Sequence, residues 1–233
     1  MLLAEPPPIP IVPSDRAVAV ARAWAADRRG RVSFAIVDSH TRARGYLAAR
    51  TYAGASVIKP MLLVAYLEER GARAVSTHDR QILDPMIRRS SNGAARRLYR
   101  HLGRDAMLRL ARRARMRRFA LPALFEARIT AADQAGFFAG LDRLVPEPHR
   151  AFARALLAGV VRSQRWGIPR GLGPGWQVYF KGGWRRGLVH QVALVEGHGV
   201  AFALAVLTDR DPSEAYGRAT LRGIAQRLVE PAG

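Results

Sequence analysis

The spacing of apolar residues changes along the chain and divides it into segments. Near the start, apolar positions recur every three or four residues, which predicts a helix from Ser14 or Asp15 to about Arg29, ended by Gly30. The next two apolar segments, 31–38 and 45–50, are short and separated by polar residues, so we expect two strands. The beginning of the fold is therefore predicted as a helix followed by a hairpin.

Helical spacing returns over residues 56–165. One helix start is clear, because Thr130 stands as an N-cap ahead of an apolar run that ends near Leu144, and a further helix follows the prolines at 146 and 148. A loop rich in glycine and proline occupies 165–176, and three β segments with short joins follow it. The stretch "DPSE" (211–214) then supplies an N-cap, a proline and a glutamate for a last helix to about Leu228.

This order favours an α+β fold. We predict a five-stranded antiparallel sheet flanked by the N- and C-terminal helices, with an all-helical insertion. The predicted units are a proline-rich extended segment (1–13), a sheet subdomain made of 14–55 and 166–233, and a helical subdomain (56–165). No apolar run reaches the ~18 residues that a transmembrane helix needs.

The net charge of +20 raises the question of nucleic acid as a partner. Arginines occur from Arg16 to Arg227, and the densest run (109–118) has neither interleaved aromatic residues nor a recognition helix. Nucleic acid is therefore not expected as the main partner, while anionic polymers or membrane surfaces stay available. The absence of cysteine excludes disulfides and thiolate chemistry, and the six histidines show no zinc spacing, so no metal or other cofactor is expected.

Arginine and lysine occur in very unequal numbers among the basic residues. Of 38 basic side chains only two, Lys59 and Lys181, are lysine, and the other 36 are arginine. Arginine stays protonated in proteins, whereas a buried lysine can lose its proton. A site that needs an amine to accept a proton therefore cannot use arginine.

Lys59 follows Ser56 by three residues at the start of an apolar helix, which puts both side chains on one face, one turn apart. Pro60 lacks the N–H that would bond the Ser56 carbonyl, which fits Ser56 at the extreme start of the helix. The pair has the form of a serine nucleophile with an amine base. A helix-capping serine beside a lysine that reaches to solvent is the alternative interpretation.

Two further motifs follow in the chain. Ser90 and Asn92 form a Ser-x-Asn within the helical segment, and Lys181 precedes Gly182 and Gly183 on the first strand of the meander. A helix cap and a strand-end bulge are the alternatives. Together the three motifs use both lysines of the chain, which favours a catalytic interpretation.

S-x-x-K, S-D-N and K-T-G are the signature of class A β-lactamases and penicillin-binding proteins. From about residue 14 to 229 the chain resembles this serine-acylating superfamily, and most closely its actinobacterial serine hydrolase branch. The resemblance rests on "SVIKPMLLVAYL", "DPMIRRSSN", "ARITAADQAGFF" and "YFKGGW...LVHQVALVE". It implies an antiparallel sheet with flanking helices and a helical insertion, in agreement with the pattern above.

The resemblance also implies residue roles. Ser56 would be acylated with Lys59 as its base, and Ser90 would pass a proton to the leaving nitrogen. Asn92 would hold the amide side chain of the substrate, and Lys181 would supply a positive field. The backbone N–H groups of Ser56 and of Trp184, which follows Gly183, would form the oxyanion hole.

Three departures from the family pattern stand out. Ser91 replaces the middle aspartate of S-D-N, and Gly182 replaces the threonine of K-T-G. The loop that carries the deacylating glutamate is expected to be largely deleted, and Glu126 is the one acid in the corresponding stretch. Glu126 is thus a candidate deacylation base, with a solvated loop acid as the alternative.

We therefore expect a serine hydrolase of the β-lactamase or D,D-peptidase type that acts on a small-molecule or peptidoglycan-like amide and is a poor β-lactamase. The alternative is a catalytically degenerate binding protein for cell-wall or other anionic polymers. The first 15 residues are too short in their apolar part for a signal peptide. An exported protein whose signal is absent from this sequence is expected, with a cytoplasmic location left open, as is the oligomeric state.

Overall fold

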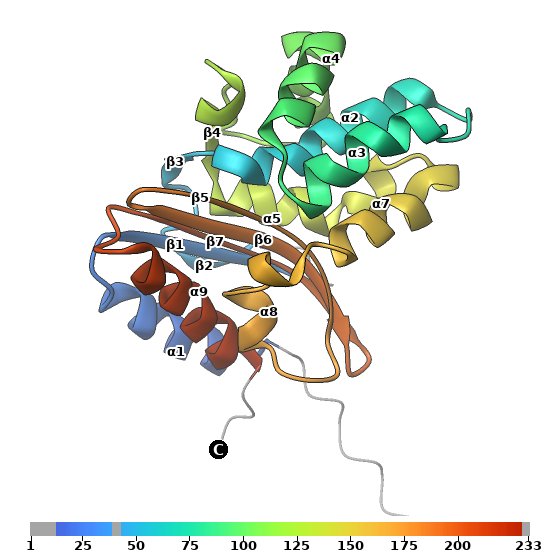
Figure 1. Ribbon diagram of the computed structural model, residues 1–233. Coiled ribbons are helices and arrows are strands. Elements are labelled where there is room, and N and C mark those ends of the chain that lie inside the picture. The colour runs from blue at the N-terminus through green and yellow to red at the C-terminus, as the bar shows by residue number, and fades with distance from the viewer. Residues whose placement is uncertain (1–12, 39–42, 230–233) are drawn as a thin grey trace, which may run out of the picture.

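The computed structural model describes residues 13–38 and 43–229 (Figure 1). Apart from its last position, the predicted proline-rich segment 1–13 lies outside the described residues, as does most of the turn predicted after residue 38. No helix of the two described ranges is both long and apolar enough to cross a bilayer.

A five-stranded antiparallel sheet forms the centre of the fold, in the order β2-β1-β7-β6-β5. Strand β1 near the beginning of the chain pairs with β7 near its end, with Arg31 opposite Asp209 and Val37 opposite Ala203. The predicted sheet is confirmed, and β5 forms one of its edges. The strands are β1 (Arg31–Val37), β2 (Arg44–Tyr46), β5 (Gln177–Arg185), β6 (Leu188–Gly197) and β7 (Val200–Asp209).

The two terminal helices cover one face of the sheet, as predicted (Figure 1). Helix α1 (Asp15–Ala26) begins at its predicted N-cap, where Ser14 Oγ accepts a hydrogen bond of 3.1 Å from the Ala17 N–H. It packs along α9 (Glu214–Val229), and the short α8 (Ile168–Gly171) packs on α9 as well. The closeness of α1 and α9 depends on Gly223, because a Cβ there would lie 2.6 Å from the Trp24 ring.

The predicted cap of the last helix is wrong by two residues. The side chain that caps α9 is Ser213, whose Oγ accepts a bond of 3.1 Å from the Tyr216 N–H. Asp211 is instead buried below the helix start and accepts a 2.5 Å hydrogen bond from Thr208 Oγ1. Burial raises the pKa of Asp211 to about 6.

Helix α5 (Ala131–Ala139) covers the other face of the sheet and contacts β1, β6 and β7. Thr130 caps it as predicted, accepting a 3.1 Å bond from the Asp133 N–H. The remaining helices lie on the same side of the sheet as α5 (Figure 1). They are α2 (Lys59–Arg70), α3 (Thr77–Arg88), α4 (Asn92–Arg113), α6 (Leu141–Leu144) and α7 (Arg150–Ala158), with 3₁₀ turns η1 (Ala55–Ile58), η2 (Leu124–Glu126), η3 (Glu147–His149) and η4 (Arg162–Gln164). Among these helices, α7 contacts β5 directly.

Two short strands depart from the prediction. Strand β2 ends at Tyr46, and the chain then forms β3 (Thr51–Ala53), which pairs with β4 (Arg128–Thr130) in a separate two-stranded sheet. The segment 56–165 is therefore not wholly helical. Strands of three residues are too short to show an alternating pattern, which is why the sequence did not reveal them. The division into a sheet subdomain and a helical subdomain stays a prediction.

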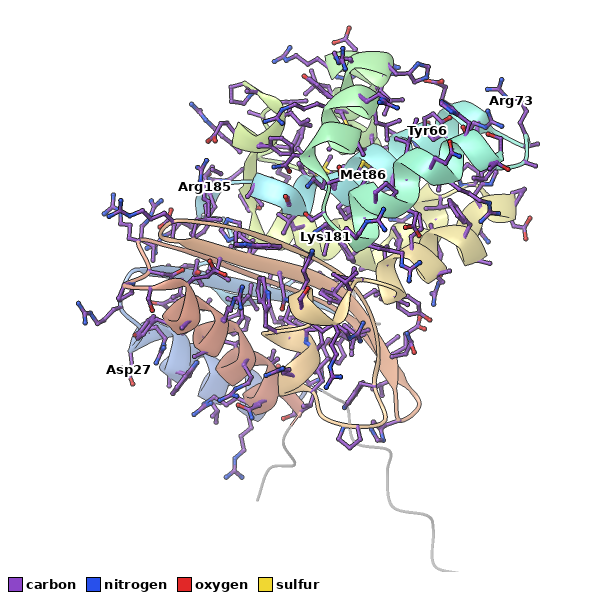
Figure 2. The ribbon with its side chains drawn as sticks, viewed as in Figure 1. Asp27, Tyr66, Arg73, Met86, Lys181 and Arg185 are labelled. Carbon is purple, nitrogen blue, oxygen red and sulfur yellow. The ribbon has the colours of Figure 1, made fainter. Side chains whose placement is uncertain are left out.

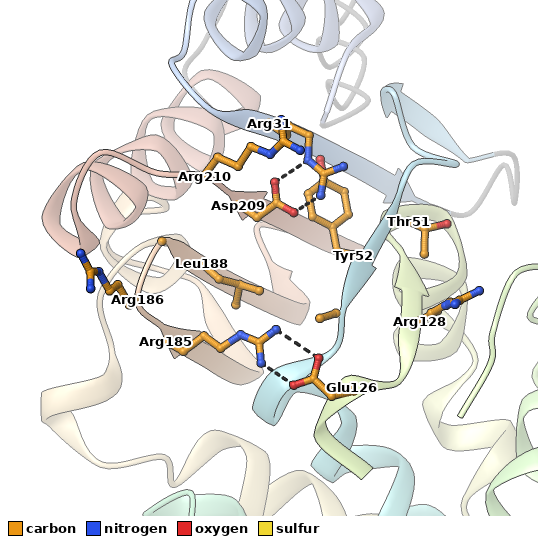
Figure 3. Close-up of a pocket in the computed structure, with 12 residues that line it drawn as sticks. Arg31, Thr51, Tyr52, Glu126, Arg128, Arg185, Arg186, Leu188, Asp209 and Arg210 are labelled. Carbon is orange, nitrogen blue, oxygen red and sulfur yellow. Dashed lines mark hydrogen bonds and ion pairs between the residues drawn. The ribbon is translucent and has the colours of Figure 1, made fainter. Parts of the chain in front are cut away.

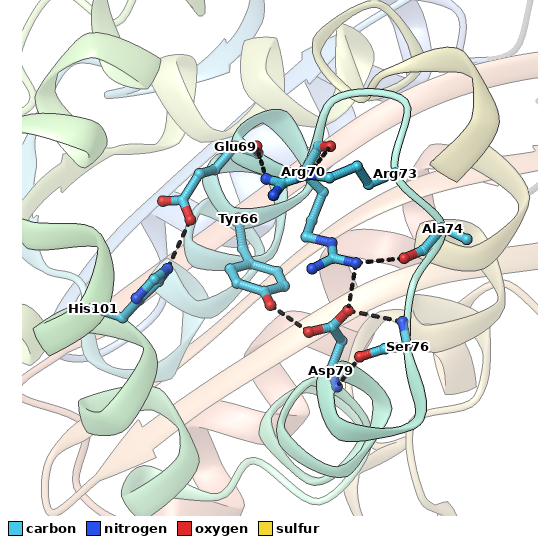
Figure 4. Close-up of polar contacts among 8 residues, drawn as sticks. All are labelled: Tyr66, Glu69, Arg70, Arg73, Ala74, Ser76, Asp79 and His101. Carbon is cyan, nitrogen blue, oxygen red and sulfur yellow. Dashed lines mark hydrogen bonds and ion pairs between the residues drawn. The ribbon is translucent and has the colours of Figure 1, made fainter.

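A polar network joins α2 to α3 (Figure 4). Ser76 and Asp79 form a reciprocal capping box at the start of α3, and the Asp79 carboxylate also accepts a hydrogen bond from Tyr66 and pairs with Arg70, both on α2. Burial, and after it the hydrogen bond to Asp79, raises the pKa of Tyr66 to about 12. The network fixes the helix whose far end leads into Ser90.

Candidate active site

Ser56 lies in η1, directly before α2, and is half-buried. Because Pro60 has no N–H, the Ser56 carbonyl accepts its hydrogen bond from the Lys59 N–H instead. This bond joins residues three apart, so the first turn is a 3₁₀ turn rather than an α turn. Ser56 is thus held at the start of the helix, as the sequence predicted.

The backbone around Ser56 is strained and closely approached by β5. Ala55 has a φ of 44°, in the left-handed region that residues with a Cβ seldom adopt. A Cβ on Gly183 would lie 2.8 Å from the Ser56 nitrogen and 3.0 Å from the Val57 nitrogen, so only glycine permits this approach. Within the described residues, the Ser56 N–H donates no hydrogen bond to the protein, which leaves it free beside the strand that carries Trp184.

Lys59 extends from α2 into a fully buried position, with 0% of its surface exposed. Its Nζ lies 2.6 Å from the Ser90 carbonyl oxygen, 3.0 Å from Ser90 Oγ and 2.8 Å from Asn92 Oδ1. Among the described residues no carboxylate forms an ion pair with it. Burial, helped by the positive charge of Arg96, lowers the pKa of Lys59 to about 7.

Lys181 is equally buried, at 0% exposure, and lies between the sheet and the helices above it (Figure 2). Its Nζ donates a 2.7 Å hydrogen bond to the Gly182 carbonyl oxygen. Burial, together with the nearby charge of Lys59, holds the pKa of Lys181 well below the ordinary lysine value. The only two lysines of the chain therefore occupy one buried region and repel each other electrostatically.

The connection between α3 and α4 holds Ser90 and Asn92 against Lys59. Ser90 is in the left-handed region, with a φ of 61°, so the chain turns sharply at this point. Ser91 is the N-cap of α4, since its Oγ accepts a 3.2 Å bond from the Ala94 N–H, and its own N–H donates to the Pro85 carbonyl at 2.9 Å. Serine in place of the family aspartate thus supports this loop as a helix cap.

Alternation along β5 explains the glycine in place of threonine. Successive side chains of a strand point to opposite faces, so Gly183 and Lys181 share the face toward η1 while Gly182 and Trp184 share the other. A Cβ on Gly182 would lie 3.3 Å from the Trp166 ring, which stacks edge-to-face with Trp184 at a centroid distance of 5.6 Å. The Trp166 ring fills the space that a side chain at position 182 would need.

Glu126 lies outside the Lys59 network. It belongs to η2, which contacts η1, and its carboxylate pairs with the Arg185 guanidinium at the end of β5, with Nη2 at 3.2 Å. The hydrogen bonds from Arg185 hold the pKa of Glu126 below its ordinary value. The carboxylate is therefore engaged by a cation and is a weaker base than a free glutamate, and a deacylating role for it stays a prediction.

His190 has a structural part in the site. It is fully buried on β6, its Nε2 lies 3.0 Å from the Ala53 carbonyl oxygen, and its Nδ1 accepts a 3.1 Å bond from the Thr208 N–H. Burial lowers the pKa of His190 to about 4. The neutral ring thus donates from Nε2 and ties the end of β3, three residues before Ser56, to the central sheet.

The structure brings Lys59, Ser90 and Asn92 into direct contact and sets Gly183 against Ser56, while Glu126 stands apart. Sequence reasoning missed Arg96 and Phe125. The Arg96 charge lowers the pKa of Lys59, and the Lys59 Nζ lies 5.4 Å from the centre of the Phe125 ring. No motif marks either residue, because their importance comes from their position near Lys59.

The model of the Beta-lactamase enzyme family matches residues 75–231 of the chain. The match includes Ser90, Asn92 and Lys181 and begins after Ser56 and Lys59. No curated protein sequence matches the chain at a significant level.

Many solved structures share the fold. A β-lactamase from Sphaerobacter thermophilus DSM 20745 superimposes with a TM-score of 0.81 at 22% identity, over 93% of this chain and 98% of that one. A class A β-lactamase representative from Bacteroides cellulosilyticus DSM 14838 gives a TM-score of 0.82 at 14% identity, over 94% and 98%. A mutant of PBP-A, in an acyl-enzyme complex with penicillin G, gives 0.80 at 15% identity, over 92% and 95%.

At these identities the structural likeness establishes the fold alone. The family match is independent of it and spans more than half of the chain. The chain therefore belongs to the Beta-lactamase enzyme family.

Proposed function

We propose that the protein is an active-site serine hydrolase that is acylated at Ser56 by the carbonyl of a β-lactam or a D-peptide-like amide. The observation that carries the proposal is the buried lysine pair, since Lys59 and Lys181 are both 0% exposed and lack a carboxylate partner in the described chain. A protein gains little stability from two buried amines whose charged forms would repel each other. Chemistry that needs an amine explains their presence.

The first step is proton transfer to Lys59. With a pKa of about 7, a large fraction of this amine is neutral near neutral pH. A neutral amine can donate to the Ser90 carbonyl and to Asn92 Oδ1 while its lone pair stays available for a proton. In the proposed step the Ser56 hydroxyl proton moves to Lys59 as Ser56 Oγ forms its bond to the carbonyl carbon.

The oxygen of the attacked carbonyl then becomes negatively charged. The Ser56 N–H, which makes no hydrogen bond within the described chain, is available to it, and the edge strand β5 offers the Trp184 N–H as a second donor. The close approach that Gly183 allows keeps the two donors near each other. Two donors of this kind stabilise the tetrahedral intermediate.

Collapse of the intermediate breaks the carbon–nitrogen bond and needs a proton on the leaving nitrogen. Ser90 Oγ lies 3.0 Å from Lys59 Nζ, so the proton taken from Ser56 can pass from Lys59 through Ser90 to that nitrogen. The acyl group then remains on Ser56, and Lys59 is neutral again. Atoms and charge balance without any cofactor.

We further propose that the acyl-enzyme is long-lived. The candidate deacylation base Glu126 is paired with Arg185, and its pKa is lowered by that pairing. Without a carboxylate to activate water, hydrolysis of the ester is slow. The protein would then be a poor β-lactamase, and an amine acceptor in place of water would suit the site.

Intact-protein mass spectrometry with benzylpenicillin over time tests the proposal. We expect an added mass equal to the whole β-lactam, mapped to Ser56 by peptide analysis, absent in Ser56→Ala and slow to disappear in the wild type. Folded wild-type protein that gains no adduct with any of several β-lactams or with a D-alanyl thioester would overturn acyl transfer. The binding-protein alternative would then be favoured.

A further inference from the structure

A second cationic region lies beyond Arg185, outside the Lys59 network. It is a cavity of about 420 Å³ between the start of β1, the strand β3 and the β5–β6 turn (Figure 3). Neither Ser56, Lys59 nor Lys181 lines it. A cavity of this size suits a small ligand.

Arginine dominates the lining. Five arginines line the cavity: Arg31, Arg128, Arg185, Arg186 and Arg210. Only two carboxylates, those of Asp209 and Glu126, line it with them. Arg31 pairs with Asp209, and Arg185 pairs with Glu126, one pair on each side of the open space (Figure 3). The remaining three form no ion pair within the described residues and are exposed around the rim.

The backbone that carries these arginines is held firmly. Arg31 and Asp209 are direct partners across β1 and β7, and the Arg31 guanidinium also lies 5.5 Å from the centre of the Tyr52 ring. Arg210 has a left-handed φ of 57°, and Gly30 packs so tightly here that a Cβ would lie 2.9 Å from the Arg210 carbonyl oxygen. Arg210 is thus kept in a conformation that is unfavourable for a residue with a Cβ, and such strain concentrates at ligand sites.

The turn on the opposite side is tied to the same frame. The Asp211 N–H donates a 3.2 Å bond to the carbonyl oxygen of Gly187, which joins the β5–β6 turn to the end of β7. The backbone at Arg186 is therefore fixed relative to the backbone at Arg210. Segments that are already ordered lose less entropy when an anion binds than flexible segments would.

From these observations we propose that the cavity is a binding site for a small oxyanion carrying at least two negative charges. Three arginines without ion pairs can balance two or more negative charges on the ligand. The planar guanidinium group donates hydrogen bonds equally well to phosphate and to carboxylate oxygens. The site is separate from the catalytic one, and its occupation does not depend on acylation of Ser56. Phosphate-bearing and carboxylate-bearing ligands share the chemistry, and the test below distinguishes them.

Isothermal titration of the full chain with tripolyphosphate and, separately, with citrate tests the site. The cavity variant Arg128→Gln/Arg186→Gln/Arg210→Gln removes the three unpaired arginines. The matched control Arg97→Gln/Arg109→Gln/Arg112→Gln removes three exposed arginines from α4, which likewise form no ion pair in the described chain. Both variants lower the net charge equally, and thermal melts check that both are folded.

We expect saturable binding of at least one anion by the wild type, weakened at least tenfold more in the cavity variant than in the control. Tighter binding of tripolyphosphate or of citrate identifies the phosphate or the carboxylate class. Ser56→Ala should bind the anion as the wild type does. The proposal is overturned by the absence of saturable binding of both anions, or by a loss in the cavity variant less than ten times that in the control.

Discussion

Strand β5 contributes to two groups of cations that are built in opposite ways. At Lys181 it joins a buried pair of lysines, whose pKa values are lowered by burial and by nearby positive charge. Four residues later, at Arg185, it joins an exposed group of arginines. There the pKa of Arg185 is raised by hydrogen bonding to Glu126, and that of Arg31 by hydrogen bonding to Asp209.

The difference explains why a chain so rich in arginine keeps two lysines. Arginine holds its charge in either setting, so it suits the exposed cavity, where a permanent charge attracts an anion. In the proposed mechanism it could not act at the buried site, where a group must release and regain a proton. On these two proposals, the choice between the two basic residues separates the cations that bind an anion from the amines that transfer a proton.

Replacing Lys59 by arginine gives the largest expected effect. Lys59→Arg keeps the positive charge but removes the proton acceptor, so the rate of β-lactam acylation should fall about 100- to 10,000-fold, the usual worth of a general base. Stopped-flow or gel-based labelling with a fluorescent penicillin measures the rate. A folded Lys59→Arg protein that is acylated within threefold of the wild type would break the contrast between lysine and arginine.

The pH dependence of stability tests whether Lys59 loses its proton in the folded protein, as arginine would not. Lys59 has a folded-state pKa of about 7 against an ordinary value of 10.5, so between these values the unfolded chain binds more protons than the folded one. The contribution of Lys59 to stability therefore improves as pH rises from 7 toward 10.5, and its burial costs most below pH 7.

Lys59→Met removes that titration. Its melting temperature relative to the wild type should be highest below pH 7 and should decrease steadily as the pH is raised to 10. Differential scanning calorimetry of both proteins across this range measures the difference, which cancels the titration of the groups that do not interact with Lys59. A difference that does not change with pH would mean that Lys59 is charged in the folded protein throughout.

Replacing Ser91, in the loop that carries Ser90 and Asn92, should have a smaller effect on acylation than replacing Lys59. Ser91→Ala removes the N-cap of α4 and should lower the free energy of unfolding by about 1 kcal/mol. It should also slow acylation, because Ser90 and Asn92 lose their support against Lys59. Urea denaturation and penicillin labelling measure the two effects, and Ser91→Asp, which restores a capping side chain, should recover both.

The smallest expected effect is that of replacing Glu126 at the arginine-lined cavity. Glu126→Gln frees Arg185 and removes one negative charge from the arginine-lined cavity. An oxyanion should therefore bind a few-fold more tightly, in line with the ~1 kcal/mol or less that exposed ion pairs contribute. Deacylation should change less than twofold. If deacylation instead slows tenfold or more, Glu126 is the base that activates water, and the enzyme turns over β-lactams.

The fold was predictable where the sequence pattern is long. The three strands of the meander and the helix that begins after Thr130 carry enough residues to show their period. Strands β3 and β4 have three residues each, and their pairing, with Tyr52 opposite Ile129, joins segments far apart in the sequence that no local pattern links. The cap of α9 was misplaced because Asp211 and Ser213 both suit an N-cap, and burial next to Thr208 decides between them.

For the candidate site, composition was the strongest signal. The rarity of lysine indicated Lys59 and Lys181, and spacing then indicated Ser56, Ser90 and Asn92. The arginine-lined cavity could not be found in this way, because its arginines come from separate segments in a chain where arginine is common. The same holds for Arg96, whose effect on Lys59 arises only when α4 folds over α2.

The pH profile of acylation shows directly whether a neutral Lys59 activates Ser56. The acylation rate is measured from pH 5 to 9 for the wild type and for two variants. Arg96→Gln removes the charge that, after burial, lowers the Lys59 pKa, and Arg97→Gln, at its exposed neighbour on α4, is the control. We predict a rate that rises with a midpoint near pH 7 in the wild type and the control, and a higher midpoint in Arg96→Gln. A rate independent of pH, or one midpoint shared by all three proteins, would mean that Lys59 is not the base that activates Ser56.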